Sequence, residues 1–356
     1  MNNKHKVAIF AAGTGGHVYP GLSIARELIK QDVDIIWIGT KHGIEKKIIG
    51  ESEIPINYIK FSGIRGKGLK SYIKLPLMLA VGTIQALKIL LKNKPNIVLS
   101  MGGYISFPCA IASYILRIPI ITHEQNIIFG LTNNILRFIS KKIILGFPMK
   151  VKNKKYIYLG NPSRYEKINI KKNKAIKGKI NILVVGGSLG AKIFNDIVPK
   201  AIYILKQNLD YEINVMHQTG KTYEVANSQY KKFQINIDLK EFIDPMIDAY
   251  KWCDIIICRG GALTITEIMN LGIPSIIIPY PYAVDDHQMK NSRYLEENNA
   301  AIVINQKFFT DVYLANTLKS FINNNELKEK LSKNISKLNK SDSTKKICEA
   351  IIKGIN

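Results

Sequence analysis

The sequence predicts an α/β protein with two doubly wound domains, each built on a parallel sheet with helices on both faces. Three observations predict this class. Runs such as residues 255–258 are apolar on both faces, which is typical of central parallel strands. Each run leads into a glycine turn and then a helical pattern, and these units occur in both halves of the chain. A length of 356 residues fits two domains.

The first such unit has a strand over residues 7–12, a helix over roughly 20–30 and a second strand over 33–38. The first strand ends in the glycine loop Gly13-Thr14-Gly15-Gly16-His17. Pro20 fits the first turn of the helix, where a missing N–H costs little. The apolar run 7–12 is too short for the core of a signal peptide, so it predicts a strand.

Two known phosphate-binding loops do not fit the chain. The dinucleotide fingerprint fails because Val18 occupies its third glycine position and Thr40 stands where the ribose-binding acid belongs. Gly220-Lys221-Thr222 resembles the end of a Walker loop, but Val215 replaces the first glycine of that loop. Any phosphate site must therefore be of another kind.

A long apolar stretch over residues 72–92 follows a basic loop over residues 61–68. Pro76 and Lys88 are among the residues that interrupt it, so it falls short of the roughly 20 apolar residues of a membrane span. Two interpretations stay open. The stretch is either an amphipathic helix that lies on an anionic membrane surface or a core helix of the first domain.

Polar side chains mark the end of the strand expected over residues 118–122, in the order His123-Glu124-Gln125-Asn126. An earlier strand over residues 97–100 leads into Met101-Gly102-Gly103-Tyr104. Polar side chains at the carboxyl end of a strand indicate the ligand crevice of an open parallel sheet. The alternative is that some of them only cap the following helix.

The second half repeats the arrangement around residues 254–267. Gly260 and Gly261 let the backbone turn tightly, and the helix that follows leaves N–H donors free for a phosphate or sugar oxygen. Glu267, expected in the first turn, is suited to accept two vicinal hydroxyls. The alternative is a capping box of Thr264 and Glu267. The other strands are expected over residues 180–185, 212–216 and 275–279, with a glycine loop over residues 186–191.

Composition narrows the class of partner. The chain has 51 Lys and Arg against 27 Asp and Glu, a net charge of +24, which fits nucleic acid, anionic lipid or a phosphorylated substrate. A coding bias toward lysine is the alternative. No nucleic-acid-binding motif is present, which argues against nucleic acid. The cysteines form no CxxC pair and are expected to be reduced core residues of a cytoplasmic protein.

Eight polar or glycine-rich stretches stand out along the full length of the chain. They are Gly13-Thr14-Gly15-Gly16-His17, Gly63-Ile64-Arg65-Gly66-Lys67-Gly68, Met101-Gly102-Gly103-Tyr104-Ile105-Ser106-Phe107-Pro108, His123-Glu124-Gln125-Asn126, Gly160-Asn161-Pro162, Gly186-Gly187-Ser188-Leu189-Gly190-Ala191, Arg259-Gly260-Gly261-Ala262-Leu263-Thr264 and Asp286-His287-Gln288. In this order they resemble the MurG family of undecaprenyl-diphospho-muramoylpentapeptide N-acetylglucosaminyltransferases, which have the GT-B fold. Two departures are mild: Gly260 replaces a serine or alanine, and the larger run 127–130 concerns the wall near the bound sugar.

The resemblance implies two Rossmann-like domains facing a central cleft. Residues 1–161 would form an acceptor- and membrane-facing domain, with residues 341–356 as a candidate to pack back on it. Residues 162–340 would bind UDP-GlcNAc. The implied reaction is an inverting transfer of N-acetylglucosamine to the 4-hydroxyl of lipid-linked muramoyl-pentapeptide. Alternatives are another GT-B lipid glycosyltransferase or a non-catalytic UDP-sugar-binding scaffold.

The resemblance also implies site residues. Glu267 would take the ribose hydroxyls, and Gln288 would use both its amide donor and its acceptor on the sugar. Ile243 would contact the uridine side through its backbone. The residues expected to bind UDP-GlcNAc are Thr14, Gly15, Gly16, Asn126, Arg164, Ser188, Ile243, Ala262, Leu263, Thr264, Ile265, Thr266, Glu267 and Gln288.

His17 and Glu124 are the two candidates for the general base. No cofactor and no obligatory metal is expected, because no Asp-x-Asp pair occurs at a cleft position. The positive residues expected to meet an anionic membrane and the lipid-linked acceptor are Arg65, Lys67, Lys74 and Lys88. The implied location is peripheral, on the cytoplasmic face of the bacterial inner membrane, with cell-wall synthesis and division proteins as candidate partners.

Overall fold

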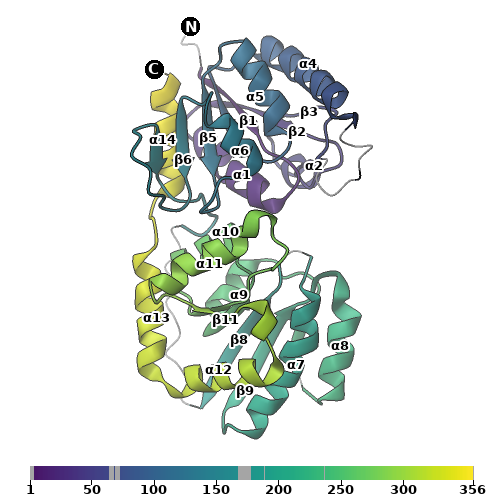
Figure 1. The fold of residues 1–356 in the computed structure, drawn as a ribbon, viewed down its shortest axis with the longest axis vertical. Helices are drawn as coiled ribbons and strands as arrows, with labels where there is room; N and C mark the ends of the chain where they lie inside the picture. The colour runs from purple at the N-terminus through teal and green to yellow at the C-terminus, as the bar shows by residue number, and fades with distance from the viewer. Residues whose placement is uncertain are drawn as a thin grey trace. The chain divides into compact units, whose positions relative to one another are not determined.

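The computed structural model describes residues 4–63, 68, 73–166, 178–187, 189–235 and 237–355. The chain divides into two compact units (Figure 1). Unit 1 comprises Met1–Arg164 together with Asp342–Asn356, and unit 2 comprises Tyr165–Ser341. The functional residues expected at Arg65, Lys67 and Ser188 lie outside the described residues.

Unit 1 is built on a sheet, sheet A, whose described strands run in the order β3-β2-β1-β4-β5-β6-β7, with every neighbouring pair parallel. The strands are β1 (Lys6–Phe10), β2 (Asp34–Gly39), β3 (Ile56–Tyr58), β4 (Ile97–Ser100), β5 (Ile120–Glu124), β6 (Lys142–Leu145) and β7 (Tyr156–Tyr158). The helices are α1 (Gly15–Ile29), α2 (Glu45–Gly50), α4 (Leu75–Asn93), α5 (Ser106–Ile115), α6 (Leu131–Leu136) and α14 (Ser343–Ile355).

The apolar run of β1 serves both faces of sheet A. Val7 and Ile9 pack with α1 and α14, whereas Ala8 and Phe10 pack with α4 and α5. Successive side chains of a strand point to opposite faces, so a strand covered on both sides must be apolar throughout. This is why the sequence lacks the alternation of a half-exposed strand.

Helix α14 completes the core of unit 1, although it follows all of unit 2 in the chain (Figure 1). Ile347, Cys348 and Ile351 are buried in the cluster formed by β1 and α1. Lys141 donates to the carbonyl of Gly354 over 3.0 Å. The same helix therefore packs by its apolar face and is held near its end by a hydrogen bond.

Helix α4 presents an apolar stripe away from its neighbours. Its buried residues, Gly82, Thr83, Ala86 and Leu90, lie on the face that packs against α5. By length and hydropathy alone this helix could cross a membrane, which differs from the expectation of a stretch too short and interrupted. Because one face contacts α5, the helix belongs to the folded unit, and the expected core helix is only partly buried.

Unit 2 is built on sheet B, whose described strands run in the order β10-β9-β8-β11-β12-β13, again with parallel pairs. The strands are β8 (Lys179–Val185), β9 (Glu212–Gln218), β10 (Asp238–Lys240), β11 (Ile255–Cys258), β12 (Ser275–Ile277) and β13 (Ile302–Val303). The α-helices are α7 (Lys192–Gln207), α8 (Tyr223–Lys232), α9 (Met246–Trp252), α10 (Ala262–Leu271), α11 (His287–Glu297), α12 (Asp311–Asn323) and α13 (Asn325–Lys337). Short 3-10 turns are η1 (Gly220–Thr222), η2 (Val284–Asp286) and η3 (Gln306–Phe308).

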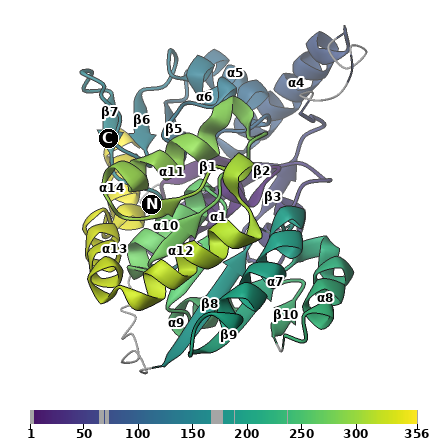
Figure 2. The same cartoon turned by 60° about the horizontal axis from the view of Figure 1, so that its bottom comes forward.

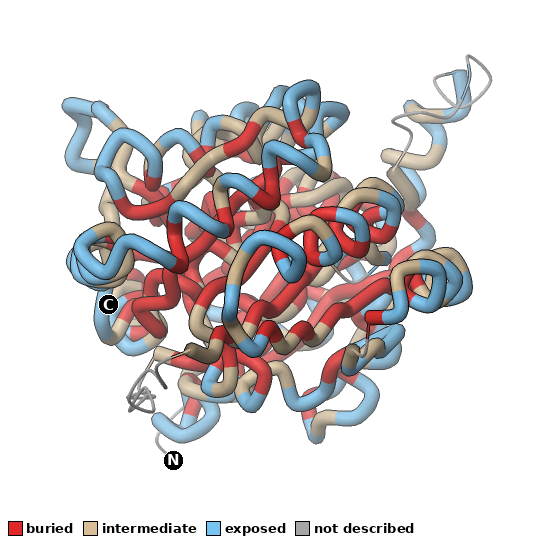
Figure 3. Tube along the Cα trace, turned by 90° about the horizontal axis from the view of Figure 1, so that it is seen from below, coloured by how far each residue is buried: buried red, intermediate tan, exposed pale blue. Residues whose placement is uncertain are grey.

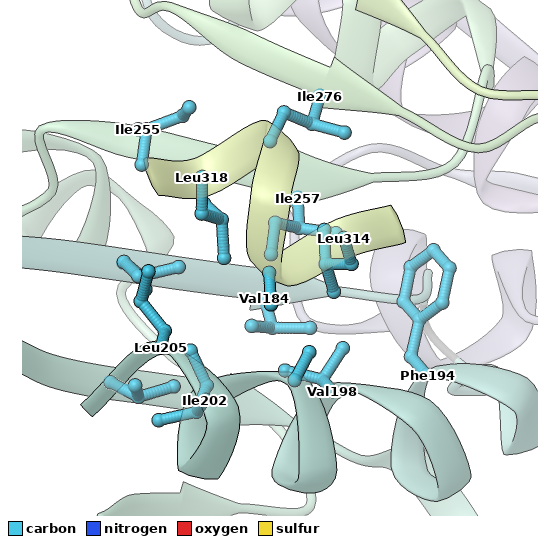
Figure 4. Packing of buried hydrophobic residues seen from close by; sticks show 14 of the residues in the cluster. Val184, Phe194, Val198, Ile202, Leu205, Ile255, Ile257, Ile276, Leu314 and Leu318 are labelled. Atoms are coloured by element: carbon cyan, nitrogen blue, oxygen red, sulfur yellow. The ribbon is translucent and has the colours of Figure 1, made fainter. Parts of the chain in front are cut away.

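The core of unit 2 fills the space between sheet B and the adjacent helices α7 and α12 (Figure 2). Val184 and Ile257 of the strands meet Val198 of α7 and Leu314 of α12 (Figure 4). The strands β8 and β11 are mostly or fully buried, and the tube coloured by burial has buried residues inside and exposed residues outside (Figure 3). The predicted class, two doubly wound parallel sheets with helices on both faces, is confirmed.

Candidate functional site

Each sheet has one point where the strand order reverses. In sheet A the chain runs from β1 outward to β3 and resumes on the other side of β1 with β4. In sheet B the same reversal separates β8 from β11. Ligands of open α/β sheets bind outside the carboxyl ends of strands at such points. The loops after β1 and β4 are therefore the candidate site of unit 1, and the loops after β8 and β11 are that of unit 2. All four loops contain glycines.

In unit 1 the loop after β1 leads into α1, which begins at Gly15 behind the extended residue Thr14. Gly13 has a φ of +92°, and a Cβ there would lie 2.9 Å from the Tyr104 ring. A Cβ on Gly103 would lie 3.4 Å from the imidazole of His17. These glycines allow the loops after β1 and β4 to approach closely, so the His17 ring lies against the second loop.

Thr14 orients the His17 ring. The Thr14 hydroxyl lies 3.3 Å from Nδ1 of His17. If Nδ1 donates to that hydroxyl, Nε2 carries the lone pair that a proton acceptor needs. A base whose second nitrogen is fixed by a neighbouring group is the usual arrangement around an activated nucleophile.

The Glu124 carboxylate is surrounded by donors. Its Oε1 accepts from the backbone N–H of Asn126 over 3.0 Å and from the Asn126 amide over 3.3 Å. Its Oε2 accepts from the Gly130 N–H over 3.1 Å and from the Asn133 amide over 2.8 Å. Burial raises the pKa of Glu124, and these hydrogen bonds oppose the rise. The carboxylate thus holds the loop after β5.

His123 and Gln125 face the core of unit 1. Gln125 donates from its amide to Nδ1 of His123 over 3.0 Å, and Nε2 of His123 lies 3.2 Å from the carbonyl of Gly160. Nε2 therefore carries the proton and donates to that carbonyl. Burial lowers the pKa of His123 from 6.5 to about 4. The ring is neutral near pH 7 and tethers the end of unit 1 to β5. Asn161 donates to the Gln125 carbonyl over 3.0 Å and adds a second tether.

In unit 2 the turn before α10 is tightly packed. A Cβ on Gly260 would overlap the backbone of Gln288 and the hydroxyl of Ser292. Gly261 is the N-cap, and no side chain caps the helix. The N–H of Ile265 donates to Gly261 over 3.0 Å, and the Thr266 hydroxyl donates to Ala262. The amides left open by helix geometry are therefore those of Ala262, Leu263 and Thr264.

Glu267 is the sixth residue of α10, not part of its first turn as expected. A capping box with Thr264 is excluded, because the N-cap is Gly261. Instead, the hydroxyl of Tyr250 on α9 donates to Oε2 of Glu267 over 2.7 Å. Tyr250 is buried and packs edge-on against Tyr165. Burial raises the pKa of Tyr250 well above 10.0, and the charge of Glu267 adds to the rise. Tyr250 therefore remains a donor that fixes the carboxylate.

The Gln288 side chain is held by one backbone contact. Its Oε1 accepts from the backbone N–H of Tyr280 over 3.0 Å. Its amide nitrogen remains available as a donor, and the oxygen keeps a second lone pair for the expected acceptor role. Asp285 and Asp286, just before it, both have left-handed backbone conformations, with φ of 54° and 56°. Such strained residues concentrate at functional sites.

Gln218 at the end of β9 links two loops of unit 2. Its Oε1 accepts from the Ile243 N–H and its amide donates to the Gly187 carbonyl, both over 2.9 Å. Because the N–H of Ile243 is already bonded, only its carbonyl is open to the expected backbone contact. Gln218 thereby anchors the glycine loop after β8.

The two arginines of the region have different surroundings. Arg259 donates to the carbonyl of Ile278 over 3.0 Å and to Gln306 over 2.8 Å, and its guanidinium lies 4.8 Å from the Phe194 ring centre. Burial lowers the pKa of Arg259 to about 10. Arg164, the last residue of unit 1 before unit 2 begins, lies 4.9 Å from the ring centre of Tyr19. Arg259 thus braces the end of β12.

Across the described residues, no group of three or more His, Cys, Asp or Glu side chains is arranged to hold a metal ion. The described cysteines, Cys109, Cys253, Cys258 and Cys348, are free and buried.

Two family models match this chain in succession. The glycosyltransferase family 28 N-terminal domain matches residues 7–145, and the glycosyltransferase family 28 C-terminal domain matches residues 181–347. Together they cover well over half of the sequence. The chain belongs to glycosyltransferase family 28.

Curated relatives and a solved structure agree with this family. A Psychromonas ingrahamii protein is 38% identical over 99% of this chain and 100% of the relative, and a Coxiella burnetii protein is 39% identical over 96% and 97%. Both are named UDP-N-acetylglucosamine–N-acetylmuramyl-(pentapeptide) pyrophosphoryl-undecaprenol N-acetylglucosamine transferase. The crystal structure of Acinetobacter baumannii MurG is 31% identical with a TM-score of 0.82, covering 98% of this chain and 99% of that one. The expected MurG resemblance and GT-B fold are confirmed.

Among the expected site residues of this family 28 member, Thr14 and His17 are in contact in unit 1, and Glu124 is bonded to Asn126. In unit 2, Gly260 contacts the backbone of Gln288. The sequence reasoning missed the side chains that hold these residues in place: Glu45, Tyr250, Gln218 and Asn133. They lie outside the glycine motifs, and nothing in their local sequence signals the distant partner.

The buried His123 makes unit 1 sensitive to acid. Its folded pKa of about 4 lies below the unfolded value of 6.5, so the unfolded chain takes up the proton first and stability falls as the pH drops below 6.5. Between pH 7 and pH 5 the loss from this residue is about 2 kcal/mol. Urea unfolding of His123→Gln should show a pH dependence weaker by that amount. His42→Gln, at an exposed position, is the control and should keep the wild-type pH dependence.

Proposed function

We propose that this chain transfers N-acetylglucosamine from UDP-GlcNAc to the 4-hydroxyl of a lipid-linked muramoyl-pentapeptide, the step that completes the disaccharide of peptidoglycan. The observation that carries the proposal is similarity over the full chain to relatives named for this transfer. The glycine turn before α10 supports it, because the amides of Ala262, Leu263 and Thr264 are open to an anionic donor.

Unit 2 is proposed to bind the donor. The open amides of Ala262, Leu263 and Thr264 would meet phosphate oxygens, where the positive end of the α10 dipole favours negative charge. Glu267, fixed by Tyr250, would accept the ribose hydroxyls. The Gln288 amide nitrogen would donate to a sugar oxygen. Ile243 would contribute its carbonyl on the uridine side. Ser188 and Arg164 keep the diphosphate and uridine roles implied by the resemblance, and Ile265 and Thr266 support the turn.

Unit 1 is proposed to receive the acceptor, and its residues Thr14, Gly15, Gly16 and Asn126 keep the UDP-GlcNAc contacts that the resemblance implies. The acceptor 4-hydroxyl attacks the anomeric carbon as the bond to the diphosphate oxygen breaks. Its proton passes to Nε2 of His17, and UDP departs with the bonding electron pair. Open amides are suited to stabilise the charge that develops on the leaving diphosphate. Inversion follows from a single displacement.

Of the two candidates, His17 is the better general base. An imidazole is suited to proton transfer around neutrality, and the Thr14 hydroxyl lies within hydrogen-bond distance of Nδ1. Glu124 already accepts four hydrogen bonds, so taking a proton would break contacts that hold Asn126 and Gly130. We therefore assign Glu124 the role of ordering the Asn126 loop.

The outer face of α4, with α5 and α6, is proposed to lie on an anionic membrane surface. Helix α4 has one exposed apolar stripe, formed by Leu77, Val81, Ile84 and Leu91. Successive members are four, three and seven positions apart, so they lie on the same face of the helix. Lys74, Lys88 and Lys92 are exposed beside it. Helix α5 packs against both α4 and α6. Exposed apolar residues on or next to α5 and α6 extend the surface: Tyr114, Ile115, Leu131, Ile135 and Phe138.

This surface is consistent with a peripheral protein on the cytoplasmic face of a bacterial inner membrane, where a lipid-linked acceptor is presented. Basic residues near an anionic leaflet contribute about 1 kcal/mol each. Arg65 and Lys67 are proposed to add to this attraction. Contacts with cell-wall synthesis and division proteins would use surfaces that the membrane leaves open.

The transfer assay uses labelled UDP-GlcNAc and the undecaprenyl-diphosphate-linked muramoyl-pentapeptide, with chromatography of the lipid product. His17→Ala should lower kcat by about 10²–10⁴-fold, the usual range for a lost general base. It should leave the Kd for UDP-GlcNAc within about twofold. Glu124→Gln, which keeps the side-chain shape, should retain the wild-type pH–rate profile even if its rate is lower. A wild-type protein that binds UDP-GlcNAc but transfers nothing would contradict the proposal.

Tyr250→Phe should weaken donor binding. The substitution removes one hydrogen bond that orients the Glu267 carboxylate, and one hydrogen bond to a charged group corresponds to about 10-fold in affinity. We expect the KM for UDP-GlcNAc to rise by about that factor with little change in kcat. Tyr203→Phe, at a half-exposed ring on α7, is the control. An unchanged KM would remove Tyr250 from the donor site.

Membrane attachment is tested by flotation with vesicles that contain cardiolipin. Lys74→Gln with Lys88→Gln should lower the partition coefficient at low salt by about 30-fold, since two charges contribute about 2 kcal/mol. The matched control replaces exposed lysines of unit 2, Lys319→Gln with Lys330→Gln. Equal flotation with neutral vesicles would exclude the electrostatic part of the attachment.

A further inference from the structure

A carboxylate is buried beneath the first glycine loop of unit 1, at Glu45. This residue begins α2 and is 0% exposed. Charged side chains are almost never fully buried unless they are paired or hydrogen-bonded, because burial removes their hydration. Within the described part of the chain, Glu45 has hydrogen-bond donors but no ion pair. Its burial therefore depends on those donors.

The backbone around Glu45 is shaped to admit its side chain. A Cβ on Gly43 would overlap the carboxylate, and a Cβ on Gly39 would lie 2.9 Å from its Cγ. Two glycines, one at the end of β2 and one just before α2, thus leave room for a single acidic side chain. A residue that only caps a helix would not need such a recess.

Glu45 reaches the loop that carries His17. Its Oε2 accepts from the backbone N–H of Gly13 over 3.0 Å, across 32 positions of sequence. Gly13 has a φ of +92°, a conformation that glycine adopts readily but does not prefer over others. The hydrogen bond selects one conformation of a loop that would otherwise be free to adopt several.

Glu45 also reaches the second glycine loop, through Thr40. Its Oε1 accepts from the Thr40 N–H over 2.8 Å and from the Thr40 hydroxyl over 2.6 Å. Because the Thr40 hydroxyl uses its proton on Glu45, it can only accept from the Tyr104 hydroxyl, 3.3 Å away. The Tyr104 ring in turn contacts Gly13. One carboxylate thus orients both loops at the switch point of sheet A.

We propose that Glu45 is a positioning residue for the transfer reaction, which fixes the Gly13–His17 loop and the Tyr104 ring and thereby the imidazole of His17. Its side chain is fully buried, so we assign it no contact with either substrate. The expected effect of Glu45 on the reaction rate rests on the proposed function. Its expected effect on the conformation of the Gly13–His17 loop rests on the geometry of unit 1 alone.

The test compares Glu45→Gln with Glu51→Gln, an exposed glutamate at the C-cap of the same helix. A glutamine at position 45 has only one side-chain oxygen. Its NH2 group must therefore face a donor, either the N–H of Gly13 or the groups of Thr40, and that contact becomes repulsive. Amide hydrogen exchange at residues 13–17 should accelerate at least tenfold in E45Q. The kcat should fall at least tenfold, with the Kd for UDP-GlcNAc within twofold of wild type. E51Q should match wild type in all three.

Thr40→Val and Thr40→Ser separate the two branches and serve if E45Q does not fold. T40V keeps the backbone N–H and removes the hydroxyl link to Tyr104, so kcat should fall severalfold while exchange at Gly13 stays unchanged. T40S should restore kcat. Wild-type exchange and kcat in E45Q, or equal kcat in T40V and T40S, would overturn the proposal. Amide hydrogen exchange at residues 13–17 is measured without substrate. If the wild-type protein transferred nothing, the proposed function would be refuted, and the exchange measurement would still test the role of Glu45.

Discussion

A glycine has no side chain that could hold its own backbone in one conformation. In this protein, buried polar side chains from other elements hold the backbone of the glycine loops. Glu45 holds the Gly13 amide, Gln218 holds the Gly187 carbonyl, and Asn291 donates to the Gly260 carbonyl over 3.3 Å. Glycine allows close approach of backbone to a ligand at the cost of conformational freedom. The distant side chains offset that freedom, so the loops are both accessible and ordered.

The same edge of sheet A places two ionisable side chains in unlike surroundings. Glu124 is enclosed by the amides of Asn126, Asn133 and Gly130, whereas His17 is held through one nitrogen by Thr14. A saturated carboxylate organises structure, and an imidazole with one nitrogen fixed is suited to exchange protons. Environment, more than residue type, distinguishes the roles we propose for them.

The sequence was sufficient for the central strands, the glycine loops and the family, because these features are local and regular. It did not predict the outer strands β3, β6, β7, β10 and β13. Residues 7–12 and 255–258 predict buried strands from apolarity alone, and the structure has β1 and β11 there. The bonds that shape the site are not local. Glu45 and Gly13 are 32 positions apart, and Gln218 and Gly187 are 31 apart. No pattern in the sequence pairs them.

Some predictions from local sequence patterns differ from the structure. The S/T-x-x-E spacing of Thr264 and Glu267 suggested a cap, but the helix begins at Ala262, so the glutamate faces Tyr250 instead. A strand assigned to residues 118–122 extends to Glu124, which places His123 and Glu124 inside the sheet.

Helix α14 gives the chain an order of assembly. Ile347, Cys348 and Ile351 fill a cavity whose other walls come from β1 and α1, more than 300 positions earlier. During synthesis the ribosome makes every residue of unit 2 before it makes these three. The apolar face of unit 1 that α14 covers is therefore exposed while unit 2 is being synthesised. It becomes buried only when α14, at the other end of the chain, has been made.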